Sequence, residues 1–92
     1  MKFFALALLL TIGSAHAVDQ RITTYRISTT VVISPGDPVT KAQNAKRPTV
    51  VYDVVNAFGA KIAERWEYHQ GRKITALIVQ GGRITTMYEV RD

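Results

Sequence analysis

The sequence predicts an α+β domain in which one short helix packs on an antiparallel sheet of four to five strands. Most of the chain after residue 21 consists of short runs rich in β-branched and aromatic side chains, which are typical of strands. The last three runs are separated only by "QG" at 70–71 and "QGG" at 80–82, which are hairpin signals. One segment between two prolines, residues 38–48, instead carries helix signals.

Residues 1–17 match a cleaved secretory signal peptide. Lys2 supplies a positive charge, residues 3–12 are almost entirely apolar, and Ala15 and Ala17 are small residues three and one positions before the expected cut. The apolar run is shorter than the roughly 20 residues that a membrane span needs. We therefore expect residues 18–92 to be a single small domain without a transmembrane segment, located in the bacterial periplasm or secreted.

The composition limits what can hold this domain together. The chain contains no cysteine, which excludes disulfides, thiolate metal sites and the lipid anchor of a bacterial lipoprotein. A domain of this size buries only about 60% of its unfolded surface, so we expect a well-packed sheet or a partner to supply the remaining stability. The net charge of +5 permits acidic partners without requiring them.

The first expected elements are a strand and the helix. Residues 22–33, "ITTYRISTTVVI", alternate between a more apolar and a more polar face, which predicts one continuous strand. We expect Asp37 to be the N-cap of the helix, with Pro38 at its first position, and Pro48 to stop it. Such a short helix is not stable alone, so it must lie on the sheet.

The remaining strands are expected to form an antiparallel meander. They cover residues 49–55, 60–69, 72–79 and 83–90, with a turn at "NAFG". The 22–33 and 83–90 strands are the expected edges of the sheet.

Trp66 and Tyr68 share one face of their strand with Ile62 and Glu64. We expect Trp66 to pack in the core, under or beside the helix, because large aromatic side chains dominate small cores. Tyr68 lies near the strand end, so core packing and a partly exposed contact are both open. Glu64 is expected either to be partly buried or to pair with an arginine at the strand edge.

The order and spacing of these motifs resemble a known family. "PGD" precedes the helix, a proline follows it, and "WEY" leads to a hairpin, an apolar strand and "GGRI". This layout resembles the small bacterial periplasmic family described as domain of unknown function 2845, over about residues 28–88. The matching positions, expected to be mainly structural, are Gly36, Asp37, Pro48, Trp66, Tyr68, Gly82 and Ile84.

More distantly, the layout is similar to the outer-membrane-assembly lipoproteins of the SmpA/OmlA (BamE) type and to repeats in β-lactamase inhibitory proteins. This resemblance implies a binding domain. The chain departs from the family at two cysteines, whose places hold Ser28 and Ala45, and at the glycine that ends the helix, which is Lys46 here. The resemblance therefore implies no disulfide in this chain. We expect the helix either to end through a left-handed Lys46 or to fray.

Catalysis is not expected from this sequence. After residue 17 the only histidine is His69, which falls at a hairpin turn, and the seven acidic residues are scattered. No spacing matches a metal site or a catalytic set. Basic residues among aromatic ones on a sheet are typical of nucleic-acid binding, but export would separate the protein from nucleic acid. We expect no enzyme activity, no metal, no cofactor and no nucleic-acid partner.

A binding module is the favoured function. The first hypothesis is contact with an unidentified envelope protein through a sheet face or edge. The second is binding of an anionic lipid or glycan by basic residues near the hairpins, which otherwise form a solvated rim. These residues are Arg65, Arg72, Lys73 and Arg83. The third hypothesis, inhibition of an exported enzyme, rests only on the distant resemblance.

Overall fold

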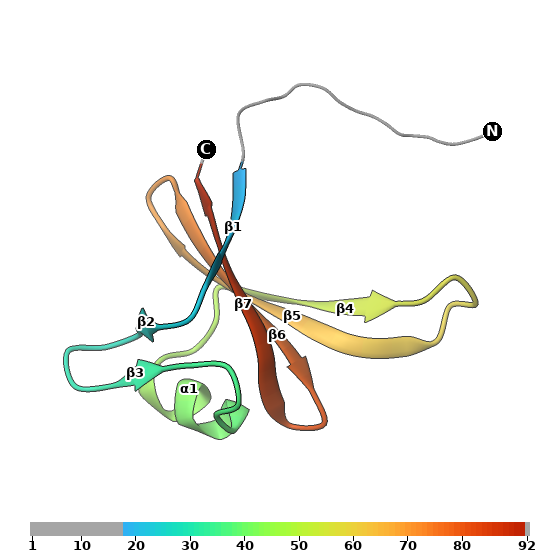
Figure 1. Ribbon diagram of the computed structural model, residues 1–92, viewed down its shortest axis with the longest axis horizontal. Helices are drawn as coiled ribbons and strands as arrows, with labels where there is room; N and C mark the ends of the chain where they lie inside the picture. The colour runs from blue at the N-terminus through green and yellow to red at the C-terminus, as the bar shows by residue number, and fades with distance from the viewer. Residues whose placement is uncertain (1–17, 92) are drawn as a thin grey trace.

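The computed structural model describes residues 18–91 and shows a five-stranded antiparallel sheet with a helix and a two-stranded hairpin on one face (Figure 1). The elements are β1 (Val18–Ile22), β2 (Tyr25–Arg26), β3 (Val32–Ile33), α1 (Val39–Ala45), β4 (Val50–Val55), β5 (Lys61–Gln70), β6 (Lys73–Gln80) and β7 (Arg83–Arg91). The α+β class, with one short helix and an antiparallel sheet, is confirmed. The predicted signal peptide, with Ala15 and Ala17, lies outside the described residues.

The predicted meander is confirmed. In the strand order β1-β7-β6-β5-β4, the last four strands of the chain are consecutive antiparallel neighbours. Their ends lie within one residue of the predicted positions. Turn residues and the two-residue alternation are local signals, so they identify these hairpins reliably.

The prediction of one continuous strand over residues 22–33 is wrong. β1 ends at Ile22, and the chain then leaves the large sheet to form the separate β2–β3 ladder. Local hydrogen bonds close the loop between β2 and β3. The Ile27 N–H donates to the Val31 carbonyl at 3.0 Å, and the Val31 N–H donates to Ser28 Oγ at 3.1 Å. The Ser28 hydroxyl thus satisfies the backbone locally, in place of a strand partner.

The edges of the large sheet also differ from the prediction. β7 is expected at an edge, but it lies between β1 and β6. The first described residues cover it, because Val18 to Ile22 pair with Arg91 to Met87. The two edges are therefore β1 and β4.

The helix lies where predicted, but its ends are built differently. Its N-cap is Pro38, and no side chain caps it. The Asp37 carboxylate instead accepts hydrogen bonds from the Ser34 backbone N–H at 2.9 Å and from Lys41 Nζ at 3.2 Å. The backbone hydrogen bond from Ser34 is the main reason why the pKa of Asp37 lies below its usual value. At the other end Lys46 is extended, with φ −164°, so the left-handed ending is wrong.

The segment before the helix is tied to the β6–β7 hairpin. The Gly36 N–H donates to the Ile84 carbonyl at 2.6 Å, and the Ile84 N–H donates to the Asp37 carbonyl at 2.9 Å. The Val39 N–H donates to the Gly82 carbonyl at 2.8 Å. Gly36 has φ +99°, a conformation that strains residues with a Cβ atom. These motif positions therefore have a structural role: they fix the start of α1 against the sheet.

The core lies between one face of the sheet, here called the inner face, and the layer formed by β2, β3 and α1. On the inner face Leu77 of β6 lies opposite Trp66 of β5 and opposite Met87 of β7. The core cluster consists of Tyr25, Ile27, Ile33, Ala42, Trp66, Tyr68, Leu77, Val79, Ile84 and Met87. The other side of the sheet, the open face, has no covering layer in the described part of the chain.

Candidate interaction surface

Trp66 and Tyr68 belong to the core. Tyr68 is 1% exposed and its hydroxyl donates to the Lys46 carbonyl at 3.1 Å, so core packing is the correct alternative for this residue. Burial raises the pKa of Tyr68 to about 12. Trp66 is also buried, as predicted, and its Nε1 donates to Glu64 Oε1 at 2.9 Å.

Glu64 pairs with a lysine rather than an arginine. Lys61 Nζ lies 2.7 Å from Glu64 Oε2, and a second carboxylate, Asp53, lies 3.4 Å from the same ammonium group. The hydrogen bonds from Lys61 and then from Trp66 lower the pKa of Glu64. This half-exposed ion pair lies near the turn of the β4–β5 hairpin and is charged at neutral pH.

Large exposed apolar side chains concentrate on the β4–β5 hairpin between residues 51 and 62, a segment here called the arm. They are Val51, Tyr52, Val55, Phe58 and Ile62. The only other such side chain in the described residues is Val32 on β3. Figure 1 shows the arm extending away from α1 and from the β2–β3 hairpin. Ile62 shares the inner face with Trp66, as predicted, but it lies beyond the layer that covers Trp66.

Phe58 is held at the tip of the arm by an ordered turn. Its side chain is 94% exposed. Asn56 Oδ1 accepts the backbone N–H groups of Phe58 at 2.9 Å and Ala60 at 3.1 Å, and the Asn56 N–H donates to the Ala60 carbonyl at 2.9 Å. Gly59 takes φ +83°, which only glycine adopts without strain. The turn thus fixes the backbone that carries Phe58, and the aromatic ring is exposed to solvent.

The open face of the sheet carries half-buried apolar side chains around one charged cluster. The apolar residues are Val50, Val54, Ile74, Ile78, Tyr88 and Val90. In the cluster, Arg65 Nε donates to Glu67 Oε2 at 2.7 Å, and His69 Nε2 lies 2.8 Å from Glu67 Oε1. Glu67 is buried although no layer covers this face. Burial raises the pKa of Glu67, but the hydrogen bonds from His69 and Arg65 outweigh it, and the net pKa lies below the usual value.

Replacing Glu67 with glutamine is expected to remove part of the acid sensitivity of the fold. A depressed carboxyl pKa stabilises the folded state above the unfolded pKa, and this contribution is lost as the pH falls through the lower folded pKa. At pH 7 the Glu67→Gln variant should be about 1–2 kcal/mol less stable, as expected for lost hydrogen bonds to a charged group.

Urea unfolding of both proteins from pH 7 to pH 3 measures this effect. The stability gap should narrow below about pH 4.5, where the unfolded glutamate takes up its proton. Asp37 and Glu64 also have lowered pKa values, but both proteins contain them, so they do not affect the difference. A gap that is constant over the whole range would contradict the prediction.

A hollow of about 720 Å³ lies beside β4, between this strand and the end of α1. Its lining residues are Gln43, Asn44, Arg47, Pro48, Val51 and Trp66. The motif residue Pro48 is thus part of its apolar wall. A smaller depression of about 350 Å³ lies between the first residues of β5 and the β6–β7 turn, where Ile62, Val79 and the Lys61–Glu64 ion pair contribute to its wall.

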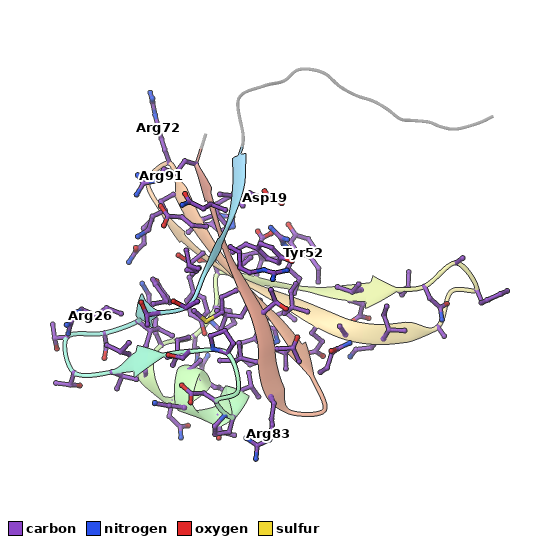
Figure 2. The ribbon with its side chains drawn as sticks, viewed as in Figure 1. Asp19, Arg26, Tyr52, Arg72, Arg83 and Arg91 are labelled. Atoms are coloured by element: carbon purple, nitrogen blue, oxygen red, sulfur yellow. The ribbon has the colours of Figure 1, made fainter. Side chains whose placement is uncertain are left out.

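The four basic residues proposed as an anion-binding rim do not form one surface. Arg72 is in the β5–β6 turn and Arg83 is at the other end of β6, about 26 Å away along eight strand residues. Figure 2 shows the two side chains at opposite ends of the sheet. Arg83 donates to the Gly36 carbonyl at 2.9 Å, and Arg65 pairs with Glu67 on the open face. Lys73 lies 5.9 Å from the centre of the Tyr25 ring.

A different basic residue joins Arg72 and Lys73. Arg91 lies directly opposite Lys73 in the β6–β7 ladder, and Figure 2 shows its side chain at the same end of the sheet as Arg72. Arg91 could not be identified from the sequence, because only strand register shows which residue lies opposite Lys73. Arg91 also pairs with Glu89, which offsets part of its charge.

Within residues 18–91, no three His, Cys, Asp or Glu side chains are grouped so that they could hold a metal ion. In the same part of the chain no helix has the length and apolar character to cross a membrane. His69, the histidine considered for catalysis, is bound to Glu67.

These features define a small α+β domain with an exposed apolar arm and an open sheet edge. No family model, curated protein or solved structure matches the chain.

Proposed function

We propose that this chain is a non-catalytic protein-binding module of the bacterial envelope and that it contacts its partner through the arm. The observation that carries the proposal is the concentration of five large exposed apolar side chains on one hairpin. Val51 and Ile62 lie on the inner face and Tyr52 lies on the open face, so the hairpin exposes apolar side chains on both of its faces, and such exposed apolar surface is typical of interaction sites. The ordered turn at Phe58 supports the same function, because a preorganised contact loses little conformational entropy on binding.

Two inferences from the sequence support a location in the envelope. Residues 1–17 resemble a cleaved signal peptide, and the motif order resembles a periplasmic family with the layout of binding domains. Binding of an anionic lipid or glycan is less well supported, because Arg83 lies at the opposite end of the sheet from Arg72 and Lys73, and Arg65 pairs with Glu67 on the open face. Inhibition of an exported enzyme would be one form of the proposed protein contact.

A photo-crosslinking amino acid at position 58 tests the proposal. The full-length chain, carrying benzoylphenylalanine in place of Phe58, is produced in a bacterium that exports it and is irradiated in intact cells. We expect covalent adducts with protein, whose masses identify the partner. The matched control carries the same amino acid at Val32, the one exposed large apolar residue of the described chain outside the arm.

A second measurement is how the binding of the partner to the purified chain depends on salt concentration. Because the arm is apolar, we expect a partner captured by the purified chain to remain bound at high salt. Reversing the charges of Arg65, Arg72, Lys73 and Arg83 should leave this capture largely intact. Equal adduct yields at positions 58 and 32, or no adducts at position 58, would contradict the proposed function.

A further inference from the structure

The free edge of β4 is the less protected of the two edges of the sheet. In an edge strand every second residue directs its backbone N–H and C=O away from the sheet, so these groups can pair with another strand. β1 carries Asp19 and Arg21 on one face and Gln20 on the other, and such polar edges resist pairing. β4 reads VVYDVV, with Asp53 as its only charged residue.

A protrusion and a hollow lie at opposite ends of this edge. The protrusion is the tip of the arm, where Phe58 is almost fully exposed just beyond the last residue of β4. The hollow of about 720 Å³ lies beside the start of β4, where Pro48, Val51 and Trp66 share its wall with the polar residues Gln43, Asn44 and Arg47. Two features at opposite ends of one edge meet when a second copy of the edge runs antiparallel to the first.

We propose that the partner of the arm is a second copy of this chain, joined to the first through antiparallel pairing of β4 with β4. This inference rests on the proposed function, since it names the occupant of the same surface. A two-fold axis perpendicular to the sheet makes such an interface self-complementary. Each Phe58 then lies at the partner's hollow, and the two five-stranded sheets form one continuous sheet.

The side chains of β4 favour the register in which the two-fold axis passes beside Tyr52, so that each Tyr52 lies opposite the partner's Tyr52. On the open face this register places Val50 opposite the partner's Val54 and Tyr52 opposite the partner's Tyr52, and apolar cross-strand pairs of this kind stabilise a sheet. On the inner face it places Val55 opposite the partner's Thr49, next to the hollow. Moving the axis to Asp53 would set two carboxylates directly opposite each other, which is destabilising.

Asp53 limits the strength of this pairing. With the axis at Tyr52, each Asp53 lies diagonally across from the partner's Asp53, about 7–8 Å away. Lys61, 3.4 Å from Asp53 in the same chain, offsets part of the repulsion. Two exposed charges at this distance weaken association about twofold to threefold, so Asp53→Asn should strengthen the dimer by this factor.

A single introduced thiol tests the register, because the chain contains no cysteine. In the proposed dimer the two Tyr52 Cα atoms are about 4.5–5.5 Å apart, within the range that a disulfide spans. Purified chain carrying Tyr52→Cys should form a disulfide-linked dimer on mild oxidation. The matched control is Gln20→Cys, an exposed position on the other edge strand.

We expect Tyr52→Cys to oxidise at least about tenfold faster than Gln20→Cys, because a thiol held opposite its copy has a millimolar effective concentration.

Sedimentation of the wild-type chain should show a concentration-dependent dimer, and Phe58→Ser should shift it toward monomer. Circular dichroism checks that all variants are folded. Equal oxidation rates together with a monomeric wild type would overturn the proposed pairing.

The two proposals fail in different ways. If position 58 crosslinks only to other proteins and the wild type is monomeric, self-pairing is overturned and the protein-binding function stands. If position 58 forms no adduct at all in cells, the proposed function itself is overturned. Adducts between two copies of the chain support both proposals.

Discussion

Replacing Tyr68 with alanine is expected to remove a large part of the stability of the fold. Tyr68 is 1% exposed and packs in the core, with its ring centre 6.0 Å from that of Tyr25. Truncating a buried aromatic side chain to alanine costs about 3–5 kcal/mol. A domain of this size has a total stability of only about 4–11 kcal/mol. Urea unfolding followed by circular dichroism measures the loss.

Tyr68→Phe separates the ring from the hydroxyl. This variant keeps the packing and removes only the hydrogen bond to the Lys46 carbonyl, so it should lose about 1 kcal/mol. If Tyr68→Ala cost no more than Tyr68→Phe, the ring would not be part of the core.

Because the hydroxyl of Tyr68 is buried, the stability of the folded protein should also fall at alkaline pH. Burial raises its folded pKa from 10.0 to about 12, so the folded state holds the proton more tightly than the unfolded state. This contribution to stability is complete below pH 10 and is lost as the pH rises toward 12. Tyr68→Phe should lack this loss. Burial also raises the pKa of Tyr25, but both proteins contain Tyr25.

The second large effect is expected for Trp66→Ala. This change opens a cavity opposite Leu77 and removes the indole N–H that binds Glu64, with an expected loss of about 3–5 kcal/mol. It also removes part of the wall of the hollow beside β4. Denaturation measures the stability, and sedimentation of the fraction that remains folded measures any change in association.

Trp66→Phe is the control for this substitution. It retains an apolar ring in the core but loses the hydrogen bond from Nε1 to Glu64, 2.9 Å long in the wild type. We expect a loss between that of a single hydrogen bond, about 1 kcal/mol, and that of the alanine variant. A fully stable Trp66→Ala protein would show that the inner face does not depend on this residue.

The candidate surface was only partly predictable from the sequence. The 49–55 strand, the "NAFG" turn and the shared face of Trp66 and Tyr68 all followed from local patterns. The exposure of Phe58 and the uncovered position of the arm could not be predicted from local patterns. Both depend on where the helix α1 lies on the sheet. The burial of Glu67 on the open face also depends on contacts with side chains on neighbouring strands.

Some features followed from the sequence because their causes lie within a few residues of each other. These are the short helix between two prolines, the four meander strands and the hairpin turns between them. Side-chain alternation and turn residues act over such short distances. The tertiary structure alone placed β1 beside β7, made β4 an edge and separated Arg72 from Arg83. Each of these depends on pairing between segments far apart in the chain, and such pairing is selected by the burial of the whole core rather than by any local pattern.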